Sequence, residues 1–386
     1  MRIIHLGDLH LGKTLGEYSL IEDQKYILNH VLDIIRKKNV DAVLIAGDVY
    51  DRSLPSEAAV NLLDNFISEL SSENIKTYII SGNHDSEDRL EYGSRLFSSR
   101  GIYITSTFNG ELVKITDEDK FGDLNVYMLP FVKASQVKHY CKDSVIETYE
   151  DAVRTVIRQA DIDWSARNIL IAHQFVVGNT APHIAGSEGA SVQNVGLIEQ
   201  ISSEIFKEFD YVALGHLHSP QSVGYEHIRY SGSILKYSLN EAGSSKSVPL
   251  IDIGEKGSVT VDLLPLDPLR DLRHITGRLD QLLKAENIVD PEDYMYVTLT
   301  DEDIINDVMG IVQQYYPNTI KIDYQNSHTK EIENFDIGEI VSDRSFEEII
   351  SEFYLKMYGT EISDEELEVM MSAAREAGVI NEADQA

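Results

Sequence analysis

The residues of this chain that are best suited to chemistry are carboxylates, an asparagine and histidines that each come just after a short apolar run. They are Asp8, His10, Asp48, Asn83, His84, His173, His216 and His218. Carboxylate, amide and imidazole donors without a thiolate suit Mn²⁺, Fe²⁺, Zn²⁺ or Co²⁺. So large a set exceeds what one ion needs but fits two ions that share a carboxylate. Such ions, about 3.5–4 Å apart, clamp a phosphoryl group during hydrolysis.

The first two of these residues follow the opening apolar run of the chain. Residues 3–6 predict a buried strand that ends at Gly7. On an extended backbone, positions 8 and 10 point to the same side, so Asp8 and His10 are expected to hold one cation together. One Asp-x-His pair arises by chance in many proteins. This chain, however, repeats the arrangement after four further apolar runs.

The segments between these residues alternate between strand-like and helical patterns. Helices are expected at about 22–38 and after the cap residue Ser56, and strands at 42–46, 76–81, 124–129, 168–172 and 210–214. Strand, helix, strand is the order of a βαβ unit. Later runs at 226–231, 248–253 and 258–264 have no helix between them and predict antiparallel strands. We therefore expect an α/β fold, a layered α/β sandwich, with its site outside the carboxyl ends of the strands.

Each of these residues also has a purely structural interpretation. A single histidine after a strand is usually a hydrogen-bonded loop residue, and Asp48 could cap a helix. Five strand ends that all carry oxygen or imidazole donors are hard to attribute to chance, so we favour the metal site.

Composition limits the function further. The chain has 386 residues and a net charge of −32, which argues against gripping nucleic acid over a broad basic face. Bound cations or a basic partner can still supply local attraction, so a nuclease is not excluded. The single cysteine, Cys141, excludes an internal disulfide. It also fits a reducing cytoplasm. We expect no membrane span and no signal peptide. The expected location is the cytoplasm, in association with the nucleoid.

Five motifs surround the chemistry-bearing residues: Asp8-Leu-His10, Gly47-Asp48-x-x-Asp51, Gly82-Asn83-His84-Asp85, His173 and Gly215-His216-Leu217-His218. Together they resemble the calcineurin-like metallophosphoesterase superfamily. Segments 82–86, 209–218, 230–238 and 246–248 are similar to a branch of that family. Its members are nucleases that act with an SMC-like ATPase and are relatives of the meiotic-recombination nuclease.

The resemblance implies a role for each matching position. The implied metal ligands are Asp8, His10 and His218 for one ion, Asn83, His173 and His216 for the other, and Asp48 as the bridge between them. His84 would face the scissile phosphate as general acid or charge stabiliser, and Asp85 would orient its imidazole. The implied cofactor is a pair of Mn²⁺ ions. The implied reaction is DNA phosphodiester hydrolysis, 3′→5′ from duplex ends and endonucleolytic at hairpins or blocked ends.

The chain divides by pattern into three parts, at 1–267, 268–335 and 336–386. By resemblance these parts are a nuclease domain, a DNA-capping domain and a helical tail. The capping domain is expected to contain a strand at 294–300, a helix at 302–315 and a strand at 320–324. Its role in shaping a DNA-binding surface is implied by the resemblance alone.

The tail predicts two amphipathic helices, which begin at the capping boxes Ser345–Glu348 and Ser363–Glu366. Their apolar stripes could pack on the chain's own core. We favour partner binding because the helices follow two complete domains and are rich in methionine. By resemblance, 342–386 would dock on the ATPase. Helices near 56–70 and 88–97 would form a homodimer within a heterotetramer.

Two other functions stay open. One is a metallophosphoesterase for small cyclic or mononucleotide diesters, and a short single-domain chain would favour it. The other is a non-catalytic scaffold of the same fold, and lost ligands would favour it. All the expected ligands and His84 are present.

Overall fold

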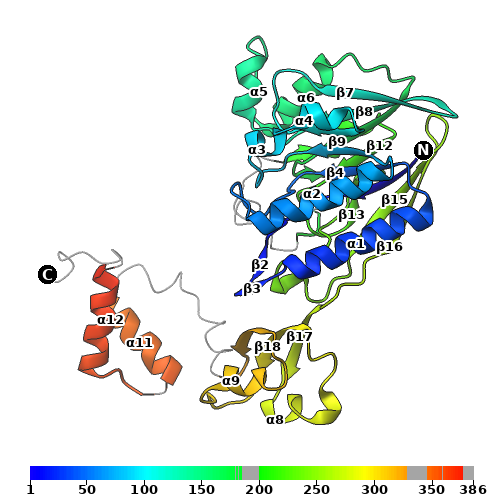
Figure 1. Cartoon of the computed structure of the whole chain (residues 1–386). Coiled ribbons are helices and arrows are strands. Elements are labelled where there is room, and N and C mark those ends of the chain that lie inside the picture. Colours follow the sequence, from blue (N-terminus) through cyan, green and yellow to red (C-terminus); the bar gives the residue numbers. More distant parts are fainter. Residues whose placement is uncertain (179, 181, 185–199, 328–345, 359, 377–386) are drawn as a thin grey trace. The chain divides into compact units, whose positions relative to one another are not determined.

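A computed structural model describes residues 1–178, 180, 182–184, 200–327, 346–358 and 360–376. The chain forms two compact units, Met1–Arg273 and His274–Ala386. Figure 1 labels many of their helices and strands.

The first unit contains two six-stranded sheets. The first sheet has the order β16-β15-β1-β4-β5-β6. Its strands are β1 (Arg2–Leu6), β4 (Ala42–Ala46), β5 (Lys76–Ile80), β6 (Ile102–Thr105), β15 (Ser247–Ile253) and β16 (Val259–Pro265). Strands β1, β4, β5 and β6 are parallel, whereas β15 pairs antiparallel with both β1 and β16. The parallel strands therefore present their carboxyl ends at one edge.

The second sheet has the order β13-β14-β12-β9-β8-β7. Its strands are β7 (Val113–Asp119), β8 (Gly122–Leu129), β9 (Arg167–Ala172), β12 (Tyr211–Leu214), β13 (Gln221–Val223) and β14 (Tyr225–Tyr230). The prediction that the segment at 226–231 is antiparallel to its neighbours is only half right. Strand β14 runs antiparallel to β13 but parallel to β12. The reason is β13, a short strand that reverses the chain once more before β14 begins.

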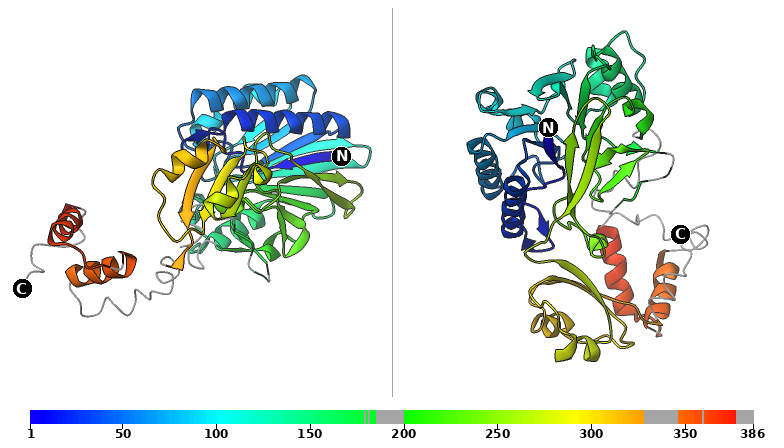
Figure 2. Two further views of the ribbon diagram at one scale, coloured as in Figure 1. Left: turned by 90° about the horizontal axis from the view of Figure 1, so that it is seen from below. Right: turned by 90° about the vertical axis from the view of Figure 1, so that its right-hand side faces the viewer.

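The two sheets pack face to face, with apolar residues of β1, β4, β5, β8, β9 and β12 between them. Helices α1 (Ile21–Lys38) and α2 (Glu57–Ser72) cover the outer face of the first sheet, as Figure 2 shows. Helices α5 (Ala134–Tyr140) and α6 (Tyr149–Gln159) contribute to a second core on the other sheet. The predicted layered sandwich is confirmed.

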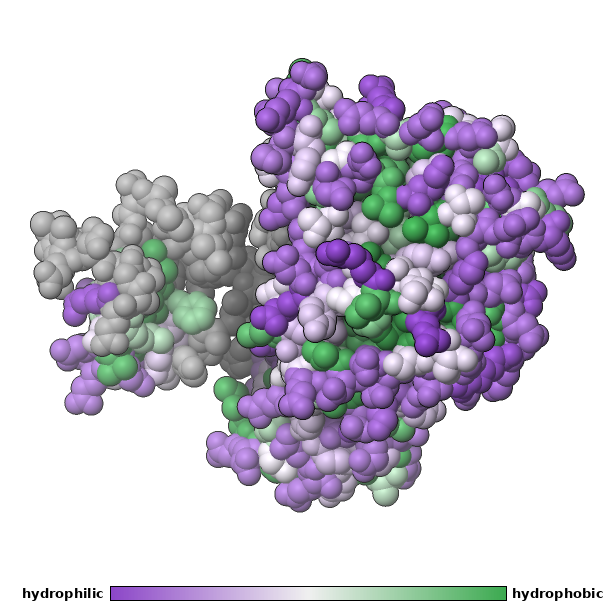
Figure 3. Space-filling view, turned by 45° about the horizontal axis from the view of Figure 1, so that its top comes forward, coloured by the Kyte–Doolittle hydropathy of each residue, from purple (hydrophilic) through white to green (hydrophobic). Residues whose placement is uncertain are grey.

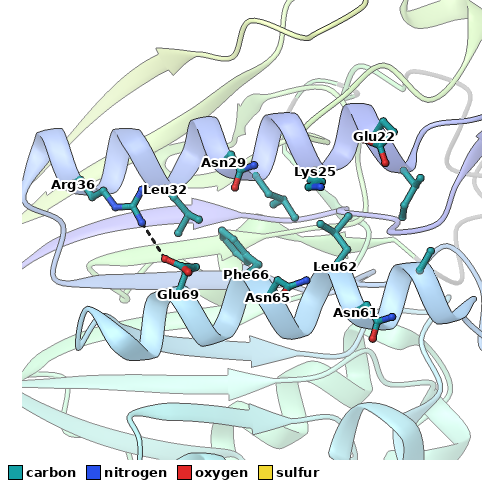
Figure 4. Close-up of a pocket in the computed structure, with 13 residues that line it drawn as sticks. Glu22, Lys25, Asn29, Leu32, Arg36, Asn61, Leu62, Asn65, Phe66 and Glu69 are labelled. Carbon is teal, nitrogen blue, oxygen red and sulfur yellow. Dashed lines mark hydrogen bonds and ion pairs between the residues drawn. The ribbon is translucent and has the colours of Figure 1, made fainter.

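Helices α1 and α2 also enclose a groove of about 600 Å³. Leu28, Leu32, Leu62 and Phe66 form its apolar part, and Arg36 contacts Glu69 at one end with an N–O distance of 3.2 Å (Figure 4). Ser56 caps α2 as predicted, because its hydroxyl accepts a hydrogen bond from the Ala59 amide at 3.3 Å.

The short elements of the first unit connect these layers. They are β2 (Thr14–Leu15), β3 (Tyr18–Ser19), α3 (Glu87–Glu91), α4 (Ser94–Ser98), β10 (Val176–Val177), β11 (Ile201–Ser202), η1 (Ser203–Phe206) and η2 (Leu239–Glu241). The outer surface is mostly hydrophilic on the face seen in Figure 3. Within the described ranges, no helix is both long enough and apolar enough to cross a bilayer.

The second unit begins with a three-stranded sheet of order β17-β18-β19. Its elements are β17 (Leu272–Gly277), α8 (Leu279–Leu282), η3 (Ala285–Asn287), β18 (Tyr294–Leu299), α9 (Val308–Gln313) and β19 (Thr319–Tyr324). The helix predicted at 302–315 is wrong in extent. Asp307 has a left-handed backbone, with φ of 50°, so α9 can begin only at Val308.

Two helices follow, α11 (Phe346–Tyr358) and α12 (Asp364–Glu376). The second predicted capping box is confirmed. The Glu366 amide donates to the Ser363 hydroxyl at 3.3 Å, and the Ser363 amide donates to the Glu366 carboxylate at 3.1 Å. The first one involves Ser345, which lies outside the described residues. Tyr354 of α11 donates a hydrogen bond to Glu366 at 2.8 Å, which joins the two helices.

Candidate metal centre

The predicted ligands lie at the carboxyl ends of neighbouring central strands. Asp8, Asp48 and Asn83 follow β1, β4 and β5, which are adjacent in the first sheet. His173 and His216 follow β9 and β12, which are adjacent in the second sheet. Because the sheets pack face to face, the two groups of loops meet at one edge of the sandwich.

The loops reach the site through backbone conformations that side chains rarely adopt. Asp8, His10, Asp48 and His216 have φ angles of 51°, 42°, 48° and 100°. The described residues contain eight non-glycine positions with positive φ, and these four are half of them. Such strain gathers at functional sites. The expectation that Asp8 and His10 continue an extended strand is wrong, since β1 ends at Leu6. They converge through two left-handed turns instead.

Glycines let the loops approach one another closely. A Cβ on Gly82 would lie 2.1 Å from Asp48 Oδ1, and one on Gly215 would lie 1.9 Å from the Ala46 carbonyl oxygen. No side chain fits at these separations, so both positions require glycine for packing.

One group of donors is formed by Asp8, His10 and His218. The Nε2 atoms of the two imidazoles lie 3.1 Å apart. All three side chains are buried, with at most 1 % of each residue exposed. Asp8, Asp48 and His173 form a second cluster with metal-binding spacing, so Asp8 lies close to both sides of the centre.

The other predicted ligands meet around Asn83. Its Oδ1 lies 3.1 Å from His173 Nε2 and 3.1 Å from His216 Nδ1. Asp48 Oδ2 lies 3.3 Å from His173 Nε2 and 3.7 Å from His10 Nε2. The Asp48 carboxylate is therefore between the two histidine groups, as a shared ligand must be.

The arrangement fits a pair of divalent cations. Asp8 Oδ2 is buried without a hydrogen-bond partner in the described part of the chain, which a native structure rarely tolerates. Two imidazole nitrogens that face each other can share only one proton, whereas a cation between them satisfies both lone pairs. Mixed nitrogen and oxygen donors match borderline divalent ions.

Electrostatics favour positive charge beside Asp48. Burial opposes ionisation of Asp48, but His173 and other nearby imidazoles lower its pKa well below the usual range. Burial also opposes protonation of His173, and Asp48 outweighs it and raises the His173 pKa to about 9. Burial raises the pKa of Asp8 to about 6. Burial, with a contribution from His173, lowers the pKa of His216 to about 3, so its imidazole is neutral and one ring nitrogen keeps a lone pair for a metal.

His84 lies at the rim of this centre. Its ring packs edge-on against His10 with centroids 4.9 Å apart, and its amide donates to Asp48 Oδ1 at 2.9 Å. Its Nδ1 donates to the Asp51 carbonyl oxygen at 3.0 Å, because a carbonyl can only accept. This bond fixes the orientation of the imidazole and does not use the second ring nitrogen, Nε2.

The predicted contact between Asp85 and the His84 imidazole is wrong. The Asp85 carboxylate accepts hydrogen bonds from the amides of Val49, Tyr50 and Gly82, at 3.1, 2.9 and 2.8 Å. Burial, together with repulsion from Asp48, raises its pKa to about 6. Asp85 thus ties the loop after β4 to the loop after β5, and the backbone of Asp51 takes the orienting role.

The sequence analysis missed a buried ion pair behind His218. Glu241 and Lys246 are 1 % and 7 % exposed, and Lys246 Nζ lies 2.5 Å from Glu241 Oε2. Lys246 also donates to the His218 carbonyl oxygen at 2.8 Å, while Glu241 Oε1 lies 3.7 Å from His218 Nδ1. Burial opposes ionisation of Glu241, yet His218 and Lys246 lower its pKa well below the usual range. The only sign of this ion pair in the sequence was that Glu241 and Lys246 come soon after the segment at 230–238.

A layered α/β sandwich whose strand ends gather two histidine-and-carboxylate groups around one aspartate defines a dinuclear metal-dependent phosphoesterase. The comparisons agree with this class. Residues 1–220 match the family model described as Calcineurin-like phosphoesterase. Residues 268–358 match the Type 5 capsule protein repressor C-terminal domain. The chain belongs to the calcineurin-like phosphoesterase family.

Within this family the chain is similar to SbcD of Staphylococcus epidermidis, which is one component of the nuclease SbcCD. The two are 36 % identical over 367 residues, which cover 94 % of this chain and 95 % of the relative. A solved dimetal phosphatase from Danio rerio is 13 % identical with a TM-score of 0.38 and covers 70 % of this chain and 98 % of that one.

Proposed function

We propose that this chain is the nuclease component of an SbcCD-type DNA repair complex and hydrolyses DNA phosphodiesters at two metal ions. It would act 3′→5′ from duplex ends and as an endonuclease at hairpins or blocked ends. The observation that carries the proposal is the pair of donor groups on either side of Asp48, with the fixed imidazole of His84 at their rim. The similarity to SbcD of the nuclease SbcCD over almost the whole chain supports a nucleic-acid substrate.

Each predicted site residue has a part in this reaction. One ion would be held by Asp8, His10 and His218. The other would be held by Asn83, His173 and His216, and Asp48 would bind both ions. Such ions, when bound, stabilise charge on the phosphoryl oxygens and lower the pKa of water. His84 would present Nε2 to the phosphate or the leaving oxygen, as charge stabiliser or proton donor. Asp85 would hold the loops that carry Asp48 and Asn83 in register. We propose Mn²⁺ as the metal, since it accepts imidazole and carboxylate ligands together.

The second unit would bind the DNA and the protein partner of this chain. We propose that 268–335 caps the DNA and that 342–386 docks on SbcC, the ATPase of the complex. Residues 337–386 contain 13 acidic and 3 basic residues, which favours a protein partner over DNA. Val369 and Met370 on α12 are 70 % and 40 % exposed and offer an apolar surface for that partner.

A homodimer through α2 and the segment at 88–97 would complete a heterotetramer. Tyr92 and Leu96 in that segment are 84 % and 76 % exposed, and Val60 of α2 is 43 % exposed. Large apolar side chains that gather at a surface are typical of protein interfaces. We propose that this assembly works in the cytoplasm at nucleoid DNA. The expected result in sedimentation at micromolar concentration is the mass of a dimer, and a monomer would contradict the interface.

Cleavage of an end-labelled hairpin duplex tests the proposed activity. With Mn²⁺ we expect opening of the hairpin and shortening from the 3′ end, and much less product with Mg²⁺. The reaction is run with and without the ATPase. If the protein leaves DNA intact under all these conditions and hydrolyses cyclic or mononucleotide diesters, the DNA assignment is wrong.

Removal of residues 342–386 tests the proposed tail. The shortened chain should lose co-purification with the ATPase and keep its bound metal, because every predicted ligand lies before residue 220. Unchanged co-purification would contradict the docking role.

A further inference from the structure

A cavity of about 550 Å³ adjoins the metal centre, and its mostly polar wall includes three large aromatic side chains. Phe131, Tyr149 and Phe175 line it together with Asn83 and His216, which are predicted ligands. The volume is within the roughly 300–1,000 Å³ of small-molecule sites. A group bound here would therefore be next to the phosphate on which the ions act.

The aromatic rings continue from the cavity to the imidazoles of the centre. The Phe131 ring lies 6.3 Å from the ring of Tyr149 and 6.4 Å from that of His173. The ring of Phe175 lies 6.1 Å from that of His216. Flat apolar side chains beside a phosphate site are the surfaces on which nucleic-acid bases stack.

The charges that line the cavity argue against a second phosphate. Asp85 and Glu87 contribute two carboxylates, and Lys133 contributes one ammonium group. An anion would gain little here, because the acidic groups outnumber the basic one. A neutral, flat group next to the scissile phosphate has no such penalty, and a nucleobase is that group.

Gln174 adds a polar group to this wall. The residue is fully buried, and neither polar atom of its side chain has a hydrogen-bond partner among the described residues. A side-chain amide offers a donor and an acceptor together, which is the pattern of a base edge. Its unsatisfied state supports a ligand that carries polar atoms around an aromatic ring.

We propose that this cavity holds the base of the 3′-terminal nucleotide, unstacked from the duplex and packed against Phe131 and Tyr149. This inference rests on the proposed nuclease function and adds to it the position of the departing nucleotide. Unstacking costs least at a terminal or unpaired base. A base pocket beside the ions therefore selects ends and hairpin loops over the interior of a duplex, without any reading of sequence.

The test compares two duplexes that differ only at the 3′-terminal nucleotide, one with adenine and one abasic. Phe131→Leu and Tyr149→Leu keep apolar volume but remove the flat ring. We expect each variant to lower kcat/KM for removal of the adenine nucleotide about tenfold, with little change for the abasic one. Phe121→Leu is the matched control, because Phe121 is 41 % exposed and precedes β8, at the sheet edge opposite the site.

A binding readout separates this inference from the activity itself. A duplex with 2-aminopurine as its 3′-terminal base and a phosphorothioate link beside it resists cleavage. When it binds the Mn²⁺-loaded protein, its fluorescence should change, because the terminal base leaves the stack of the duplex and packs against Phe131 and Tyr149. Loss of this change in both variants, with unchanged Mn²⁺ binding, supports the pocket. Equal losses of activity on adenine and abasic substrates, or an undiminished fluorescence change, would overturn it. If the unaltered protein cleaves neither duplex, the proposed function fails instead.

Discussion

The buried pair of Glu241 and Lys246 gives the sharpest test of the metal centre. Glu241→Gln removes the carboxylate that faces His218 Nδ1 and keeps nearly the same shape. Loss of a carboxylate behind a ligand histidine typically costs 10–100-fold in metal affinity. The 3.7 Å between Glu241 Oε1 and His218 Nδ1 is longer than a hydrogen bond. We therefore expect the lower end, a loss of about tenfold, or about 1.4 kcal/mol.

Stability must be separated from metal affinity in this experiment. Glu241→Gln leaves the Lys246 ammonium buried without its carboxylate, which costs about 3–5 kcal/mol of folding free energy. The double variant Glu241→Gln/Lys246→Met removes both charges, and such replacements are often neutral. We expect the double variant to regain thermal stability in the presence of a chelator but not to regain metal affinity.

Calorimetric titration with Mn²⁺ and thermal unfolding supply the two measurements. Glu226→Gln is the control, because the Glu226 side chain is 92 % exposed and pairs only with Arg229 among the described residues. Unchanged Mn²⁺ affinity in the double variant would refute the reasoning, since it would show that the carboxylate does not act on His218. If Mn²⁺ affinity fell in proportion to thermal stability in all the variants, the role of Glu241 and Lys246 would be structural only.

Three further predictions concern other parts of the first unit. His84→Gln should keep both metal ions, measured by elemental analysis, and lower DNA cleavage by roughly 10²–10⁴-fold; full activity would contradict its role. Gly82→Ala should abolish Mn²⁺ binding, because the added Cβ would lie 2.1 Å from Asp48 Oδ1, while Gly243→Ala meets no atom within 4 Å and should bind normally. Burial opposes ionisation of Asp119, but two hydrogen bonds from Arg167 lower its pKa well below the usual range. This ion pair therefore stabilises the fold above the unfolded-state pKa of about 3.9, and the stabilisation is lost as pH falls towards the pKa of Asp119 in the folded state. Asp119→Asn should lower Tm at pH 7 and make Tm depend less on pH in the acid range. Equal Tm values for the variant and the unaltered protein would contradict this.

The strands and their ends were predictable because burial leaves a direct mark on the sequence. Every residue of β4 and β9 is buried; β4 is an uninterrupted run of apolar or small residues, and β9 ends in such a run before His173. The convergence of Asp48 with Asn83, and of His173 with His216, followed from one rule, that parallel strands share a carboxyl edge. The direction of β14 did not follow, because a three-residue strand such as β13 is too short to produce a periodic pattern.

The partners of the imidazoles could not be predicted from residue types. His84 and His173 each donate Nδ1–H to a backbone carbonyl, that of Asp51 at 3.0 Å and that of Ala46 at 2.7 Å. Every residue has a carbonyl, so no sequence pattern marks the ones that are used. By contrast, Asp85 carries a visible carboxylate next to His84, and the inference that it contacts the ring was natural and wrong. The path of the backbone, which places the Asp51 carbonyl oxygen beside His84 Nδ1, determines the partner of this ring.

The carboxylates of Asp8 and Asp48 are alike in how their two oxygens are used. Asp8 Oδ1 accepts the His216 amide at 2.8 Å, which leaves Oδ2 unpartnered within the described residues. Asp48 Oδ1 accepts the His84 amide at 2.9 Å, which leaves Oδ2 facing His173 and His10. One oxygen of each therefore ties a loop of another strand, and the other is left to bind a cation. These side chains fix the loops that carry them, so the donor atoms are already gathered in the folded chain and would need little rearrangement to bind ions.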